Sequence, residues 1–185
     1  MVALLIWIII VLVVILALAF MIYYNRFTVY ENRVNNSLSQ IDVQLKKRAD
    51  LVPNLINTVK GYATHEKGIM KDVTDARKAL LSAKSITDKA KAGAELQTAL
   101  KSIFAIAENY PQLKANENFL QLQQELSAIE DKVAYTRQYY NDSILTFNNM
   151  VKTFPGVMFA KLYGKSEKPF LEITAEERTV PKVQF

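Results

Sequence analysis

The sequence places its one histidine beside a carboxylate, at His65 and Glu66, and this pair could in principle transfer protons. Consecutive residues of a helix point about 100° apart, however, so these two side chains do not converge on one site. Glu66 also fills a slot in an apolar periodicity, between Tyr62 and Ile69. We therefore interpret Glu66 as a structural carboxylate, partly shielded by the surrounding helices and paired with a basic side chain.

The remaining polar residues give little support for catalysis. A di-iron helical bundle requires Glu-x-x-His pairs, and the sequence has none. The absence of cysteine excludes disulfides, thiolate metal sites and a cysteine nucleophile. The sequence thus predicts no catalytic residue, no metal ion and no cofactor, and we expect that the protein is not an enzyme. The carboxylates that this argument sets aside as metal ligands are Asp42, Asp50, Glu66, Asp72 and Asp75.

The charge distribution argues against a nucleic-acid partner. The net charge is +5, but acidic residues are interspersed with basic ones. Nucleic-acid binding calls for a concentrated basic face. The only dense basic cluster is 46–48, and Asp42 and Asp50 flank it. A mild positive charge instead suits the surface of an anionic membrane.

The first 24 residues carry no charged side chain. As a helix they would extend about 36 Å, which is enough to cross a bilayer. A cleaved signal peptide is the alternative, with Ala17-Leu18-Ala19 as its cleavage site. We favour a retained anchor, because a basic leading region is missing and the apolar run continues beyond that site. Arg26 and Arg33 follow the run, so the positive-inside rule predicts the N-terminus outside and the rest of the chain in the cytoplasm of a single-pass protein.

Four later segments have apolar residues at alternating steps of three and four, which is typical of amphipathic helices. We expect them at 27–48, 50–83, 85–107 and 114–154. Asp50 would cap the second segment, with Pro53 in its first turn. The sequence therefore predicts an all-α protein, an antiparallel up-and-down four-helix bundle preceded by a transmembrane helix. The predicted domains are an anchor (1–24), the bundle (25–163) and an extended C-terminal tail (164–185).

This topology predicts two surfaces. The first and third links would share the end of the bundle away from the membrane, where we expect a partner-binding surface formed by Lys46, Lys47, Arg48, Tyr110 and Lys114. The last helix would return toward the bilayer and bring an apolar patch to the headgroups or to a neighbouring subunit. Its residues are Phe154, Met158, Phe159, Leu162 and Tyr163. The alternative is that this patch closes the core of the bundle.

Two glycines suggest close packing of helices. Gly61 and Gly68 lie seven residues apart on one side of the second predicted helix. Glycine in a helix costs about 1 kcal/mol relative to alanine, and the close approach of another helix would offset that cost. That helix could belong to this bundle or to a second protomer, so we expect a homo-oligomer.

Long stretches of the sequence resemble the LemA family. They are SQIDVQLKKRADLVPNLINTVKGYATHE at 39–66, the segment from Pro111 to Gly164, and the closing KPFLEI and PKVQF. The resemblance implies a bacterial single-pass membrane protein with a soluble four-helix bundle. It implies no catalytic residue. Members of that family are often encoded near membrane-associated proteins, including heat-shock-type membrane metalloproteases, so the resemblance points to such a system as a partner.

Together these features favour a membrane-anchored helical scaffold or adaptor that acts through protein–protein contacts and self-assembly. The lipid bilayer is one expected partner, and the protein partner is not specified by the sequence. A lipid-sensing or membrane-organising oligomer is the alternative, and an enzyme with a site between helices is the least favoured interpretation.

Overall fold

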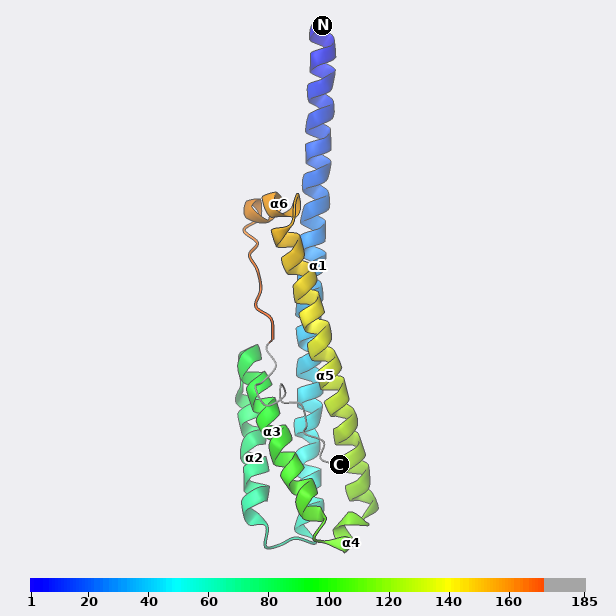
Figure 1. Ribbon diagram of the computed structural model, residues 1–185, viewed down its shortest axis with the longest axis vertical. Helices are drawn as coiled ribbons and strands as arrows, with labels where there is room; N and C mark the ends of the chain where they lie inside the picture. The colour runs from blue at the N-terminus through cyan, green and yellow to red at the C-terminus, as the bar shows by residue number, and fades with distance from the viewer. Residues whose placement is uncertain (172–185) are drawn as a thin grey trace, which may run out of the picture. The chain divides into compact units, whose positions relative to one another are not determined.

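A computed structural model of the chain describes residues 1–171, and these residues form helices without any strand. The helices are α1 (Val2–Lys60), α2 (Lys67–Ser82), α3 (Ile86–Ala107), α4 (Pro111–Lys114), α5 (Glu117–Lys152) and α6 (Gly156–Leu162) (Figure 1). The predicted all-α class is confirmed. The predicted tail can be followed only to Leu171, because its remainder lies outside the described residues.

The chain divides into two compact units. Unit 1 combines Met1–Ser37 with Tyr139–Phe170, and unit 2 combines Leu38–Gln138 with Leu171. Helices α1 and α5 each contribute to both units.

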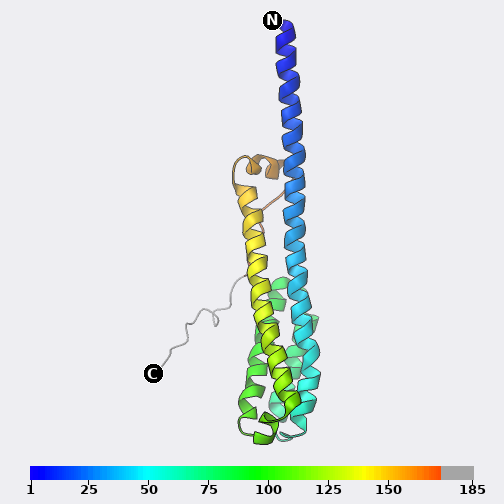
Figure 2. The same cartoon turned by 90° about the vertical axis from the view of Figure 1, so that its right-hand side faces the viewer.

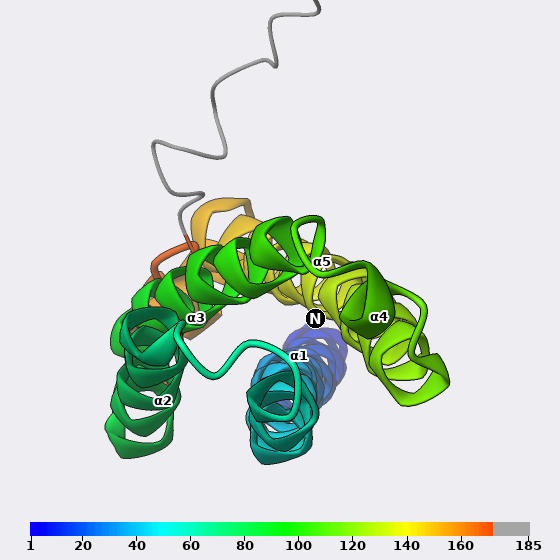
Figure 3. The same cartoon turned by 90° about the horizontal axis from the view of Figure 1, so that it is seen from below.

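Unit 2 is an antiparallel bundle of four helices. It contains the second part of α1, then α2 and α3, and the first part of α5, with the short α4 in the last connection. Figure 3 looks along these helices, and Figure 1 shows that successive long helices run in opposite directions. Apolar side chains from every helix are buried between them, including Leu55, Val73, Leu96, Leu113 and Phe119. The predicted up-and-down bundle is therefore confirmed.

Two helix starts in unit 2 follow local capping rules. The Ser85 hydroxyl accepts a hydrogen bond from the Asp88 amide at 3.0 Å, and this caps α3. At the start of α5, the Asn116 side chain accepts a bond from the Phe119 amide at 3.0 Å. Each cap satisfies a backbone donor that has no partner inside the helix.

The predicted link between Lys46 and Asp50 is wrong. Helix α1 continues through this region to Lys60, with Pro53 in its interior, and the chain turns only at 61–66. Proline has no backbone N–H, so the carbonyl of the residue four positions earlier, Ala49, loses its helical partner. The Arg77 Nε of α2 donates to that carbonyl at 2.7 Å. A side chain from the next helix thus supplies the hydrogen bond that Pro53 removes.

The predicted close approach of a helix at Gly61 and Gly68 is also wrong within the chain. Gly61 lies just past the end of α1, and a Cβ added there would contact only the Thr58 carbonyl of the same turn, at 3.5 Å. A Cβ added at Gly68 would meet no atom within 4 Å. These glycines therefore mark the turn and the start of α2.

Unit 1 is built around the first part of α1, the end of α5 and α6 (Figure 2). Phe27 of α1 is buried and meets Phe147 of α5 edge-to-face, with ring centroids 6.1 Å apart. Val34 and Ile144 are buried as well. Residues 2–18, by contrast, are all exposed.

The bond between Arg77 and Ala49 gives a double-mutant prediction. We expect Arg77→Met to lower the free energy of unfolding by about 1–3 kcal/mol, because a shielded carbonyl loses a charged donor. In a Pro53→Ala background the backbone N–H restored at position 53 satisfies that carbonyl, so the same change should cost less. Urea unfolding of the full-length protein in detergent, followed by circular dichroism, measures both values.

Lys78→Met is the matched control, because Lys78 is exposed and pairs with Asp75 of the same helix. Lys78→Met should change the free energy of unfolding only slightly, with or without Pro53. An equal cost of Arg77→Met with and without Pro53 would contradict the assigned role of the arginine.

Candidate functional site

The turn that leads into α6 requires a small residue. Gly156 is buried, and a Cβ added to it would lie 2.2 Å from the Met150 carbonyl oxygen of α5. No real Cβ approaches a backbone atom so closely, so any other residue would displace the turn. Gly156 therefore lets α6 start close to α5, within reach of α1.

Aromatic rings fix α6 against α1. Phe159 stacks on Tyr23, with ring centroids 4.5 Å apart and planes at 5°. Tyr163 meets Phe20 at 5.0 Å and Phe27 at 5.9 Å, both edge-to-face. Its hydroxyl also donates to the Phe20 carbonyl at 2.7 Å. These contacts join α6 to α1 on both sides of the point where the charge-free segment ends.

A glycine turns the chain at the end of α6. Gly164 has a φ of +64°, which L side chains rarely adopt. The amides of Gly164 and Lys165 bond back to the carbonyls of Lys161 and Ala160, at 3.3 and 2.8 Å. This pair of bonds is a Schellman motif, and it ends the helix and aims the next residues at α1.

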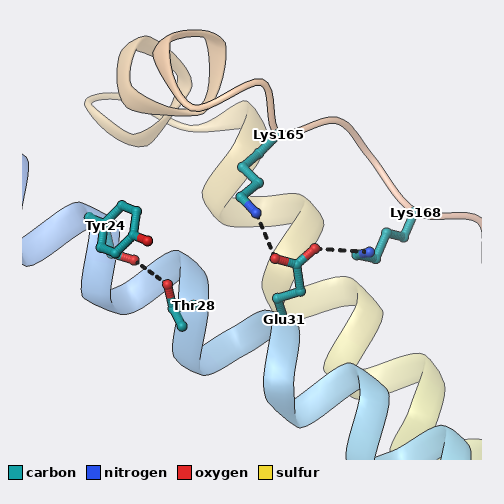
Figure 4. Close-up of polar contacts among 5 residues, drawn as sticks. All are labelled: Tyr24, Thr28, Glu31, Lys165 and Lys168. Carbon is teal, nitrogen blue, oxygen red and sulfur yellow. Dashed lines mark hydrogen bonds and ion pairs between the residues drawn. The ribbon is translucent and has the colours of Figure 1, made fainter.

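Two lysines beyond this turn share one carboxylate of α1, as Figure 4 shows. The ammonium of Lys165 lies 2.6 Å from Glu31 Oε2, and that of Lys168 lies 3.3 Å from Glu31 Oε1. The hydrogen bond from Lys165 lowers the pKa of Glu31 below its ordinary value of 4.5, against the opposing effect of burial, and Lys168 lowers it further. Glu31 is therefore a charged anchor for the chain after α6.

The same stretch is also held by α5. The Asn148 side chain bonds to both backbone groups of Lys168, accepting from its N–H at 2.9 Å and donating to its carbonyl at 2.8 Å. The Lys168 ammonium also lies 5.3 Å from the centre of the Phe147 ring, within cation–π range. Neither Asn148 nor Glu31 was identified from the sequence as a site residue, because their partners lie 20 and 134 residues away.

The structure divides the predicted membrane-proximal residues into two groups. Phe159 and Tyr163 pack on α1, as described above. Phe154, Met158 and Leu162 are 80%, 63% and 68% exposed. Met158 and Leu162 are four residues apart and so share one face of α6. We call these two residues, together with Phe154 in the turn before α6, the exposed apolar face of α6. The face lies in unit 1, on a helix that packs against the end of the charge-free segment.

The turns at 61–66 and 108–116 meet at one end of unit 2. The Tyr110 hydroxyl donates to Glu66 at 3.3 Å, and the Asn116 amide donates to the Tyr62 hydroxyl at 3.0 Å. Glu66 is half-buried, as expected, but its hydrogen-bond partner is a tyrosine instead of a basic side chain. We call this end of unit 2 the distal turns. Lys114 lies there too, and it pairs with Glu108.

The predicted partner-binding residues do not all lie together. Tyr110 and Lys114 belong to the distal turns, but the cluster from Lys46 to Arg48 lies inside α1, well before its end at Lys60. Lys46 and Lys47 are exposed, whereas Arg48 is only 3% exposed. The prediction that these three residues form a link at the tip is wrong, because α1 does not end at Asp50.

Arg48 is a functional candidate that the sequence could have revealed. In a continuous helix the core positions Ile41, Leu45, Val52 and Leu55 leave a slot at 48, following the steps of four and three. Because the first predicted helix was expected to end at residue 48, this position was not recognised as part of the core. Burial lowers the pKa of the Arg48 guanidinium, while the charge of Glu130 raises it.

Other chemistry receives no support from the described part of the chain. Within residues 1–171, no three His, Cys, Asp or Glu side chains gather as a metal site would require. His65 is exposed. Helix α1, by contrast, contains a segment that is long and apolar enough to cross a membrane, and none of that segment is buried.

The shared carboxylate gives a prediction about pH. A carboxyl whose pKa is lowered by folding contributes stability above its unfolded pKa, and this contribution is lost as the pH falls through the folded pKa. We expect the Glu31 side-chain carbon to titrate below 4.5 in NMR spectra of the full-length protein in nanodiscs. Lys165→Met should raise this midpoint more than Lys168→Met does, since Lys165 makes the shorter contact.

Lys161→Met is the control, because Lys161 is exposed on α6. It should leave the midpoint unchanged. The assignment would be refuted by a Glu31 midpoint that is the same with and without Lys165.

Comparison with known proteins places the chain in a family. The model of the LemA family matches residues 37–185. Protein LemA of Metamycoplasma hominis is 28% identical over 128 residues, covering 67% of this chain and 57% of that protein. Magnetosome protein MamQ of Magnetospirillum gryphiswaldense is 26% identical over 168 residues, covering 76% of this chain and 61% of that protein.

Magnetosome protein MamQ 1 of Paramagnetospirillum magneticum is 23% identical over 167 residues, with the same two coverages of 76% and 61%. The chain thus spans only about three fifths of the length of these relatives. The family match covers the part of α1 that lies in unit 2, the whole of α5 and α6, and the distal turns. This membrane-associated helical protein belongs to the LemA family.

Proposed function

We propose that the protein is a membrane-anchored scaffold that binds a partner protein at the distal turns. One observation carries the proposal: two separate turns are tied together there by the Tyr110–Glu66 and Asn116–Tyr62 hydrogen bonds. Apolar and aromatic groups remain exposed beside them, with Tyr62 at 39% and Leu120 at 41%. A fixed surface with exposed tyrosine loses little entropy on binding, which favours protein contacts.

Charge on the distal turns adds to this surface. Lys114 and His65 are exposed there together with Glu108. Mixed charges around an apolar centre are typical of the rim of a protein interface. The acting surface needs no catalytic group, and we assign the protein no enzyme activity.

Membrane attachment would give the scaffold its location. The proposed anchor is the charge-free segment of α1, and the arginines after it favour a cytoplasmic bundle with the N-terminus outside. The family resemblance suggests a membrane metalloprotease system as the first partner to test. Self-assembly of the scaffold is part of the proposal.

Photo-crosslinking in cells tests the partner surface. With the crosslinker at Gln112, which is exposed, mass spectrometry should recover the same partner repeatedly. We expect Lys114→Glu and Leu120→Asp to abolish this product, because they reverse a charge and break the apolar centre of the distal turns.

Lys47→Glu and Val43→Asp are matched controls on exposed positions of α1. They should leave the crosslink intact. If the crosslinked product is lost with the control pair but retained with Lys114→Glu and Leu120→Asp, the partner binds α1. That result would refute the proposal that it binds the distal turns.

The exposed apolar face of α6 supports a second function, in which the protein senses or organises lipid. Rings of Phe159 and Tyr163 hold α6 beside α1 where its charge-free segment ends, which supports contact of this face with the headgroup region. The function requires that Phe154, Met158 and Leu162 contact lipid directly.

Fluorescence tests this contact in full-length protein in liposomes. The chain has one tryptophan, so Trp7→Phe removes the tryptophan fluorescence and Phe154→Trp then places a single tryptophan on the face. Brominated lipids should quench the probe at Phe154. Tyr135→Trp is the control at another exposed aromatic position, in unit 2, and it should not be quenched. Equal, weak quenching at both positions would rule out the lipid contact.

A further inference from the structure

A charged side chain lies in the interior of unit 2 without a direct charged partner. Arg48 is only 3% exposed and occupies a core position of α1. It forms no ion pair or hydrogen bond with any residue in the described part of the chain. Glu130 acts on it only as a neighbouring charge, and the like charge of Arg137 opposes it. Burial of most of this side chain is costly, because no bond to the described residues replaces the water that it loses.

Arg48 borders a cavity of about 210 Å³ between α1, α3 and α5. Polar groups reach this cavity from the two other helices: Gln97 and Lys101 from α3, and Gln123, Ser127 and Glu130 from α5. The remaining wall is apolar, formed by leucine and phenylalanine side chains. The cavity thus combines a buried cation, several amide and hydroxyl groups and a carbon-lined wall, which is the usual composition of a small-molecule site.

The charges of the lining select the ligand. Arg48 and Lys101 are positive and Glu130 is negative, so the lining carries a net charge of +1. A monoanion neutralises this charge, whereas a phosphate dianion would leave the site with a net negative charge. A guanidinium offers two parallel donors that match the two oxygens of a carboxylate. A volume of about 210 Å³ suits a short carbon chain.

We propose that this cavity is a binding site for a small monocarboxylate, whose carboxyl group pairs with Arg48 and whose carbon chain lies against the apolar wall. Gln97, Gln123 and Ser127 are placed to bond the carboxylate or a polar substituent. Occupation of the site stabilises unit 2, because the ligand joins three helices and compensates the buried charge. The site is separate from the distal turns and from the exposed apolar face of α6, so it does not depend on the proposed function.

Thermal unfolding of the full-length protein in nanodiscs tests the site, with sodium butyrate as the probe and sodium chloride at equal ionic strength as the reference. A ligand that binds only the folded state raises the Tm in a saturable way. We expect this rise with butyrate and none with inorganic phosphate. Saturation-transfer NMR of butyrate gives an independent measure of binding.

Three variants make the test specific. Arg48→Met keeps the aliphatic stem and removes the charge, and it should weaken butyrate binding by about tenfold or more. Lys47→Met removes an adjacent exposed charge and should leave binding unchanged. Glu130→Gln removes the repulsive carboxylate and should tighten binding. If Arg48→Met does not fold, Arg48→Lys serves in its place, because it retains the charge but loses the two parallel donors and should bind more weakly.

Butyrate binding that Arg48→Met abolishes and Lys47→Met preserves supports the proposal. Butyrate binding that is equal in all variants, or the lack of a saturable response in the wild type, overturns it. A response to phosphate that depends on Arg48, without a response to butyrate, overturns the assignment of a monocarboxylate.

Discussion

The continuity of α1 across Pro53 is the constraint on which the other features depend. A proline in a helix interior costs about 3 kcal/mol, partly because one carbonyl loses its donor. Here the donor comes from Arg77 of α2. The replacement bond lets one helix carry the apolar segment, the core positions of both units and the residue before the first distal turn. It also joins α2 to α1 at a defined register.

The end of the described chain returns to the same helix. In unit 1, Gly156 brings α6 near α5, aromatic rings attach it to α1, and the Schellman turn at Gly164 sends Lys165 to Glu31. Each step depends on the one before it, since α6 must lie on α1 before Lys165 can reach a carboxylate there. Residues far apart in the sequence thus form one cluster beside the end of the charge-free segment, with three apolar side chains left exposed.

The described residues of unit 2 form a core of buried apolar side chains, and Arg48 occupies a position in that core. An apolar residue at 48 would pack with less cost, because replacing a buried charge by a hydrophobic side chain is often neutral or stabilising. The arginine is therefore difficult to explain by stability alone. The cavity beside it contains polar groups from α3 and α5. In the proposed site, the charge of the arginine pairs with a carboxylate in this cavity.

The sequence by itself determined the helical class, the charge-free segment and the helix limits that depend on short-range chemistry. The helix expected at 85–107 matches α3, which begins directly after Ser85 and ends at Ala107. Periodicity also identified most buried positions, since a helix needs one apolar face. These features are encoded within a few residues of where they act.

Only the tertiary structure decided where α1 ends, and with it the positions of Lys46, Lys47 and Arg48. The local rule for proline predicts a helix start near Asp50, but the bond that cancels this rule comes from a residue 28 positions away. The same holds for Glu31 and Lys165, which meet across 134 residues. Capping and periodicity act between neighbours in the chain, whereas a hydrogen bond to a free carbonyl or an ion pair requires only proximity in space.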